Sequence, residues 1–290
     1  MDLIKTSQGV SDKVASLRSE GKSIGFVPTM GALHEGHLSL VKQCIAGNDV
    51  CIASIFVNPT QFDNKEDLEK YPGNRKQDCE YLAAAGVDIA FVPTEEEIYP
   101  EPDTRRFDFG RLDKVMEGKH RPGHFNGVAQ VVSRLFDIVK PDRAYFGEKD
   151  FQQLAIIREM VRQLKLDTQI VPAPVVREAS GLALSSRNER LAARQKEVAV
   201  NISGTLFKSR EWANKYSVQE TIRKVTDTLD SCDELKVEYY EIVDGHTLQP
   251  LTDWTDSDYI VGCIALFCGE VRLIDNIVYK TDSQIKGKQK

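Results

Sequence analysis

Apolar runs and helical patterns alternate along the first part of the chain. Five short apolar runs, bounded by turn residues, occupy residues 23–28, 49–59, 87–93, 143–146 and 168–174. Helical patterns occupy residues 36–46, 75–85, 127–139 and 151–164. Buried strands that alternate with helices are typical of a parallel sheet covered on both faces. The pattern therefore predicts an α/β fold, a Rossmann-like doubly wound parallel sheet, over residues 1–175.

The alternation stops after about residue 176. Two polar helical patterns and then three apolar strand patterns occupy residues 192–214, 218–231, 236–243, 258–267 and 271–279. The last two strand patterns flank "CGE", which predicts a hairpin. Residues 176–290 are therefore expected to form a second, smaller α+β domain.

Two segments fit neither pattern. Residues 94–124 are rich in proline, glycine and charge, and we expect an excursion with a short strand at 105–109 and a short helix. The lysine-rich tail, residues 280–290, is expected to be solvated and without fixed structure.

Composition narrows the functional classes. No apolar run approaches the roughly 18 residues of a membrane span, and the N-terminus lacks the pattern of a signal peptide. A cytoplasmic protein is therefore expected. The net charge of −6 and the pI of about 5.5 argue against a large nucleic-acid surface, although a local basic patch could still bind a small anion.

The six cysteines are scattered along the chain and include no C-x-x-C pair. This arrangement favours buried thiols in a reducing compartment over a disulfide framework or a zinc site. Cys263 and Cys268 are the nearest pair, and their surroundings, "IVGCIALFCGEV", are typical of small core residues.

Polar segments follow three of the expected strands. "PTMGALHEGH" follows the first strand, "VNPTQF" the second and "FGEKDFQQ" the fourth. In an open parallel sheet, ligands bind beyond the carboxyl ends of the strands. Because these segments carry His, Asn, Gln and Lys, we expect them to converge on one binding cleft.

The common nucleotide-binding motifs are absent. G-x-G-x-x-G does not occur, and the "GKS" at 21–23 lacks the earlier glycine of a P-loop and precedes its strand. A standard dinucleotide site and a P-loop ATPase are therefore excluded. Zinc is disfavoured, because His34 and His37 are three residues apart instead of four, Gly36 lies between them and no third ligand is evident.

His34 and His37 fall at the expected first turn of a helix. Free backbone N–H groups and the positive end of the helix dipole favour an anion there, and a glycine lets a phosphate approach the backbone. Imidazole N–H groups could then donate to phosphate oxygens as negative charge builds during nucleotidyl transfer. The alternative is that the two histidines serve only as helix caps or as satisfied core residues.

Five collinear motifs now point to a family: "PTMGALHEGH", "FVNPTQF", "RPGHFNGV", "RAYFGEKDFQQL" and "GLALSSRN". The first is similar to the HIGH-type motif of the nucleotidyltransferase superfamily. Together they closely resemble the pantoate–β-alanine ligase (pantothenate synthetase) family from about Ile24 to Asn188, and more weakly to the end at "RLIDNI".

The resemblance implies a two-step reaction. The (R)-pantoate carboxylate attacks the α-phosphorus of ATP, which gives pantoyl adenylate and diphosphate, and the amine of β-alanine then displaces AMP to give pantothenate. The implied partners are these small molecules, with no nucleic acid and no membrane, and the family suggests a homodimer.

The resemblance also assigns roles to residues. His37 is the expected proton donor, His34 its phosphate-contacting partner, and Lys149 a further catalytic group on the phosphates, with Asp150 near the ribose and Val176 at adenine. The full expected ATP site is Met30, Gly31, Ala32, Leu33, His34, Glu35, Gly36, His37, Gly147, Glu148, Lys149, Asp150, Val176, Leu184, Ser185, Ser186 and Arg187.

Two glutamines are the expected pantoate ligands. Gln61 and Gln153 would hold the hydroxyls and the carboxylate, with Gln61 also near β-alanine, because an amide offers both a donor and an acceptor to a polyol. Asp78 is the candidate carboxylate for the Mg²⁺ that accompanies ATP. Arg121 and His124 match positions expected at the cleft edge, with a structural or a chemical role.

The chain departs from the family pattern in two places. Thr60 stands where a larger apolar residue is common, which changes the packing near pantoate, and Gly73 and Asn74 stand where the family usually has Arg-Thr. The role of this second loop is therefore open.

Two other functions stay open at this point. A cytidylyl- or adenylyltransferase would use the same histidines and stop at a nucleotide-linked product, without an amine acceptor. A fragment related to aminoacyl-tRNA synthetases would bind tRNA, although the acidic balance and short length count against it.

Overall fold

The computed structural model describes residues 1–62, 68–69 and 71–281, and the chain divides into two compact units. The first unit comprises Met1–Phe109, Arg121–Glu148 and Gln153–Val176. The second comprises Gly110–His120, Lys149–Gln152 and Arg177–Lys290. Two short internal segments thus group with the second unit, which the sequence pattern did not indicate.

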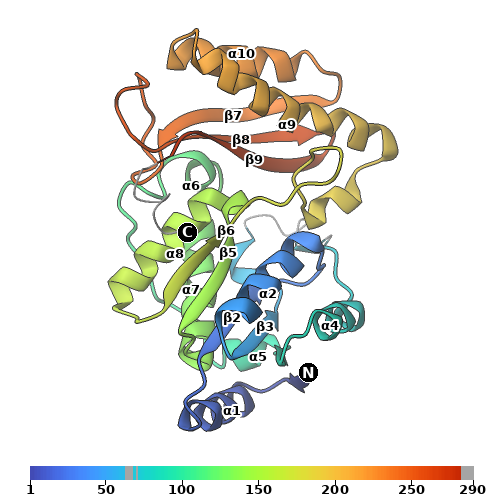
Figure 1. The fold of residues 1–290 in the computed structure, drawn as a ribbon, viewed down its shortest axis with the longest axis vertical. Coiled ribbons are helices and arrows are strands. Elements are labelled where there is room, and N and C mark those ends of the chain that lie inside the picture. Colours follow the sequence, from blue (N-terminus) through green and yellow to red (C-terminus); the bar gives the residue numbers. More distant parts are fainter. Residues whose placement is uncertain (63–67, 70, 282–290) are drawn as a thin grey trace. The chain divides into compact units, whose positions relative to one another are not determined.

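The first unit is built on a parallel sheet of six strands in the order β1-β4-β3-β2-β5-β6. Figure 1 labels β2, β3, β5 and β6 of this sheet. The strands are β1 Asp2–Ile4, β2 Ile24–Thr29, β3 Val50–Ile55, β4 Ile89–Phe91, β5 Arg143–Gly147 and β6 Gln169–Ala173. β3, β2 and β5 are neighbours, so the three polar segments of the sequence analysis follow the carboxyl ends of three adjacent strands.

Helices cover both faces of this sheet. They are α1 Ser7–Ser19, α2 Glu35–Gly47, α4 Arg75–Ala84, α5 Glu95–Ile98, α7 His124–Val139 and α8 Phe151–Leu164, with a 3-10 turn, η1, at Pro59–Gln61. Leu40 of α2 and Leu82 of α4 pack in one cluster with Val27. Phe26, whose side chain points to the opposite face, meets Phe136 of α7 with ring centroids 6.2 Å apart. The predicted doubly wound α/β architecture is confirmed.

The expected strand at 105–109 is wrong. Side chains of α7 satisfy the backbone there: Asn126 Oδ1 accepts from the Phe107 N–H at 2.9 Å, and Gln130 Nε2 donates to the Arg105 carbonyl at 2.8 Å. The segment therefore has hydrogen-bond partners without pairing to a strand. Two elements that the pattern did not indicate, β1 and α1, precede the first expected strand.

The second unit has an antiparallel sheet of three strands in the order β7-β8-β9, with its own apolar core. Its elements are α6 Met116–His120, η2 Glu148–Asp150 (of which Glu148 belongs to the first unit), η3 Ser186–Arg190, α9 Ala193–Ala213, α10 Val218–Asp230, β7 Leu235–Asp244, β8 Ile260–Cys268 and β9 Val271–Lys280. β8 and β9 flank Gly269, which has a φ of 56°, and form the predicted hairpin.

Polar contacts attach α6 to this sheet. Arg272 of β9 donates to both carboxylate oxygens of Glu117, at 2.9 and 2.6 Å. The hydroxyl of Tyr239 on β7 donates to the same carboxylate at 2.9 Å. These bonds hold residues 110–120 to the second unit, although they are far from it in sequence.

The cysteines are free thiols, and Cys263 and Cys268 are buried in β8, as the sequence predicted. Within residues 1–62, 68–69 and 71–281, no helix has the length and apolar composition needed to cross a membrane. The tail prediction concerns residues 280–290, of which 282–290 lie outside the described residues.

Candidate functional site

The loop of residues 29–34, termed the histidine loop, leads from β2 to α2 and turns sharply. Gly31 and Ala32 both have left-handed backbone conformations, with φ of 85° and 50°. Thr29 supports the turn, because its hydroxyl donates to the Ser54 carbonyl at 2.6 Å and accepts from the Gly31 N–H at 3.2 Å. A left-handed alanine is uncommon, so the loop needs such support from outside its own backbone.

Asp78, on the first turn of α4, supplies the main support. Its two carboxylate oxygens accept from the N–H groups of Ala32 at 3.0 Å and Leu33 at 2.8 Å, and the residue is only 3% exposed. A Cβ atom at position 31 would lie 2.8 Å from Asp78 Oδ2. Gly31 therefore serves two needs, the left-handed φ and the close approach of the carboxylate.

His34 and His37 cap the N-terminus of α2. Nδ1 of His34 accepts from the Gly36 N–H at 3.1 Å, and Nδ1 of His37 accepts from the His34 N–H at 3.3 Å. The ring centroids are 4.1 Å apart. A nitrogen that accepts carries no proton, so in each neutral ring the proton is on Nε2.

The capping role that the sequence analysis held as an alternative is therefore present. It does not exclude a catalytic role, because capping uses Nδ1 and a donor to phosphate would use Nε2. The cap also fixes the tautomer that places a donor at Nε2 in both rings.

The segment after β3 presents Gln61, which is 8% exposed. Asn58 Nδ2 donates to Gln61 Oε1 at 3.2 Å, while Gln61 Nε2 lies 3.0 Å from the sulfur of Met30 in the histidine loop. These contacts bring the second predicted polar segment against the first. They also turn the amide so that its NH₂ group faces the histidine loop.

Neighbouring elements hold this segment in place. Asn58 Nδ2 also donates to the Gly127 carbonyl at 3.2 Å, and a Cβ atom at Gly127 would lie 2.4 Å from the Thr60 carbonyl oxygen. The Tyr99 hydroxyl donates to Asn58 Oδ1 at 2.9 Å. Burial raises the pKa of Tyr99 above its ordinary value, so this hydroxyl keeps its proton at neutral pH.

His124, the first residue of α7, and Arg121, which lies just before that helix, support Gln61. His124 Nδ1 lies 2.7 Å from the Gln61 carbonyl oxygen, and its Nε2 lies 3.2 Å from Arg121 Nη1. A carbonyl oxygen only accepts and a guanidinium only donates, so His124 donates from Nδ1 and accepts at Nε2. These contacts give the pair a structural role at the Gln61 backbone.

The remaining predicted residues belong to two different units. Gly147 ends β5, Glu148 follows it, Gln153 lies on α8, and Val176 is the last residue of the first unit. Lys149, Asp150 and the segment 184–187 belong to the second unit. That these residues approach the histidine loop stays a prediction.

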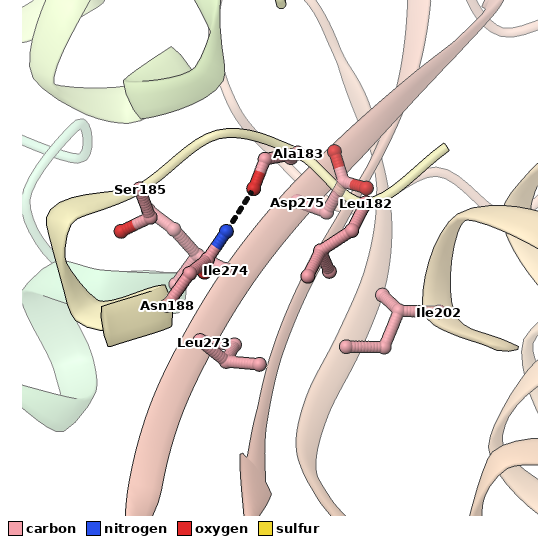
Figure 2. A pocket seen from close by; sticks show the side chains of 8 residues that line it. All are labelled: Leu182, Ala183, Ser185, Asn188, Ile202, Leu273, Ile274 and Asp275. Carbon is pink, nitrogen blue, oxygen red and sulfur yellow. Dashed lines mark hydrogen bonds between the residues drawn. The ribbon is translucent and has the colours of Figure 1, made fainter. Parts of the chain in front are cut away.

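In the second unit, Ser185 caps the short helix η3 by accepting from the Arg187 N–H at 3.3 Å. Figure 2 shows the adjacent pocket, where Asn188 Nδ2 donates to the Ala183 carbonyl at 3.0 Å. The pocket is lined by Leu182, Ala183, Ser185, Asn188, Ile202, Leu273, Ile274 and Asp275. Arg177 donates to both carboxylate oxygens of Asp275, at 2.6 and 2.9 Å, so the charge of Asp275 is paired.

Sequence reasoning missed the roles of three residues. Asp78 was predicted only as a metal ligand, and its bonds to Ala32 and Leu33 span more than 40 positions of sequence. Thr29 and Tyr99 carry no local signal for their contacts. Among the residues that the structure describes, no group of three or more His, Cys, Asp or Glu side chains could hold a metal ion.

Comparison with known proteins identifies the family of this chain. A model of the family described as pantoate-beta-alanine ligase matches residues 2–278. Pantothenate synthetase from Phocaeicola vulgatus is 60% identical over 281 residues, which cover 97% of this chain and 100% of that protein. The enzyme from Bacteroides thetaiotaomicron is 59% identical over 280 residues, with 97% and 99% coverage.

Solved structures give the same result. Pantothenate synthetase from Thermus thermophilus matches with a TM-score of 0.88 and 44% identity, over 97% of this chain and 100% of that one. Pantoate-beta-alanine ligase from Francisella tularensis, solved with a β,γ-ATP ligand and β-alanine, matches with a TM-score of 0.81 and 38% identity. That match covers 97% of this chain and 99% of the other.

Proposed function

Because this chain belongs to the pantoate–β-alanine ligase family, we propose that its histidine loop, its two glutamines and the residues after β5 form the active site of that reaction. The enzyme condenses pantoate with β-alanine at the expense of ATP and yields pantothenate, AMP and diphosphate. The observation that carries the assignment of residues is the pair of imidazoles that cap α2, each of which accepts a backbone N–H at Nδ1 and so leaves Nε2 as the donor.

In the first step, a carboxylate oxygen of pantoate bonds to the α-phosphorus of ATP, and the bond from that phosphorus to diphosphate breaks. Negative charge builds on the α-phosphate oxygens. His34 and His37 donate to these oxygens from Nε2, and Lys149 neutralises the phosphates. Donors that are already oriented before charge develops lower the barrier most.

In the second step, the neutral amine of β-alanine attacks the acyl carbon of pantoyl adenylate. The bond from this carbon to the AMP oxygen breaks, AMP leaves, and the nitrogen loses a proton. Gln61 and Gln153 hold pantoate through both steps, and Gln61 also contacts β-alanine. The Gln61 NH₂ group faces Met30 of the histidine loop. This orientation supports the role of Gln61, because it turns a hydrogen-bond donor toward the expected ATP site.

Mg²⁺ is proposed to accompany ATP, where it would neutralise phosphate charge, and Asp78 is the predicted carboxylate ligand. The loop N–H groups already account for one contact at each Asp78 oxygen. Both oxygens are thus engaged by the loop and Asp78 is only 3% exposed, so these contacts favour a role in the loop over one at the metal ion. The magnesium role stays a prediction, and no step above depends on it.

The need for an amine acceptor distinguishes the ligase from the alternative nucleotidyltransferase. A ligase releases AMP in proportion to β-alanine, whereas an enzyme that stops at a nucleotide-linked product does not need the amine. Omitting β-alanine should therefore reduce AMP release to slow hydrolysis of the adenylate. Retention of the protein on RNA at physiological salt would favour the tRNA-binding alternative instead.

Arg187→Ala is expected to weaken ATP binding and to let more adenylate hydrolyse. We propose that Ser185, Ser186 and Arg187 reach the phosphates when the second unit closes. Closure would shield the mixed anhydride from water. The ratio of AMP to pantothenate formed should then rise above one.

The matched control is Arg194→Ala, which removes the same charge from an exposed position of the second unit. A ratio that stays at one in Arg187→Ala, with unchanged ATP affinity, would show that the loop has no closing role. A homodimer and a cytoplasmic location are further proposals, which rest on the family resemblance and on composition.

A further inference from the structure

We propose that Asp78 is a positioning residue that holds the histidine loop in its reactive conformation by binding two backbone N–H groups. The inference rests on the proposed function, because it concerns the loop that carries His34 and His37. It assigns Asp78 an effect on the adenylation step that does not act through a metal ion.

The contacts of Asp78 are specific to a carboxylate. Each oxygen accepts one N–H group, from Ala32 and from Leu33, at 3.0 and 2.8 Å. Both N–H groups belong to buried residues, so they would lack a partner without Asp78. Consecutive N–H groups next to a left-handed residue form a concave site for an anion, and here the protein's own carboxylate fills it.

Asp78 is itself held firmly. Asn74 caps α4, because its side-chain oxygen accepts from the Gln77 N–H at 3.2 Å and its carbonyl accepts from the Asp78 N–H at 2.9 Å. The first turn of a helix also favours a negative charge. Asn74 departs from the family pattern, and these bonds give it a structural role. It holds Asp78 in place, and Asp78 in turn holds the histidine loop.

The bound N–H groups are adjacent to the catalytic histidines. Leu33 precedes His34, whose backbone is extended, with φ −138° and ψ 174°, and which is the N-cap of α2. The Asp78 bond to the Leu33 N–H fixes the Ala32–Leu33 peptide plane, which lies one residue before His34. A rotation of that plane would move the His34 ring and the N–H that it donates to His37 Nδ1.

Asp78→Asn tests the proposal with the smallest change of shape. An amide offers one accepting oxygen and turns an NH₂ group toward the other backbone N–H, so one bond is lost and two donors face each other. We expect pantoate-dependent exchange of diphosphate into ATP to slow by roughly tenfold to a hundredfold, which corresponds to one unpaired buried group. The KM for pantoate should change by less than about twofold.

Two further readouts separate positioning from the alternatives. The Mg²⁺ concentration for half-maximal activity should match wild type, whereas a lost metal ligand would raise it and high Mg²⁺ would restore the rate. In folded Asp78→Asn labelled with ¹⁵N-histidine, the ring nitrogens of His34 and His37 should shift, which a loss of global stability alone would not cause. Glu80→Gln, an exposed charge on the same helix, is the control and should change none of these.

The proposal is overturned by a folded Asp78→Asn enzyme with wild-type exchange and unshifted histidine signals, or by full rescue with Mg²⁺. If Asp78→Asn does not fold, Gly31→Ala displaces the same carboxylate without changing charge and should give the same pattern. Absence of exchange in the wild-type enzyme would instead contradict the proposed function, so the two failures are distinguishable.

Discussion

His37→Ala and His34→Ala are each expected to slow formation of pantoyl adenylate by roughly 10² to 10³, because each removes a donor aimed at charge that develops in the transition state. This loss corresponds to about 2.7 to 4 kcal/mol. Single-turnover formation of adenylate, measured without β-alanine, isolates this step from the second. The binding of ATP, measured separately, should change far less.

Each histidine is also part of the α2 cap, so the loss of rate must be separated from a loss of stability. Removing a helix cap typically costs about 0.5 to 2 kcal/mol of unfolding free energy. His34→Asn is the matched control, because asparagine can accept from the Gly36 N–H but has no imidazole. We expect His34→Asn to unfold at a urea concentration close to that of wild type and still to form adenylate slowly. Near-normal turnover in a folded variant that carries both His34→Ala and His37→Ala would contradict this mechanism.

Gln61→Leu and Gln153→Leu are expected to lower kcat/KM for pantoate by about tenfold to a hundredfold and to leave ATP binding nearly unchanged. Leucine keeps the approximate volume but leaves substrate hydroxyls unpaired in a desolvated site, which costs about 1 to 3 kcal/mol. Gln61→Leu also removes the acceptor of Asn58 Nδ2, so it should be the more damaging of the two.

Gln77→Leu makes the same exchange at an exposed position of α4 and serves as the control. Calorimetric titration with a non-hydrolysable ATP analogue reports nucleotide affinity in each variant. Equal losses for pantoate and nucleotide in the Gln61 and Gln153 variants would show that these amides do not select pantoate.

The sheet could be predicted because its central strands are buried on both faces and are therefore apolar throughout. β2 and β3 have six residues each, and almost all are buried. β1 has three residues and lies at the edge of the sheet, with no fully buried side chain, so its sequence gave no such signal. The segment 105–109 shows the opposite error: its alternation resembles a strand, but Asn126 and Gln130 of α7 bind its backbone instead.

Those residues of the candidate site that lie together in short sequence motifs could be predicted. His34 and His37 fall within one helical turn, and Gln61 follows the next strand of the sheet. The residues that orient them come from distant parts of the chain: Tyr99 lies 41 positions from its partner Asn58, and Asp78 lies 45 positions from Leu33. Such contacts depend on how α4 and the segment after β4 pack, which periodicity does not specify.

The transfer of oxygen from pantoate to AMP tests the central claim most directly. Pantoate labelled with ¹⁸O in both carboxylate oxygens is incubated with the enzyme, ATP, Mg²⁺ and β-alanine. The masses of the products are then measured by mass spectrometry. If the carboxylate attacks the α-phosphorus, AMP gains one ¹⁸O, pantothenate keeps one in its amide carbonyl, and diphosphate gains none. AMP without label, or label in diphosphate or inorganic phosphate, would contradict the adenylate route.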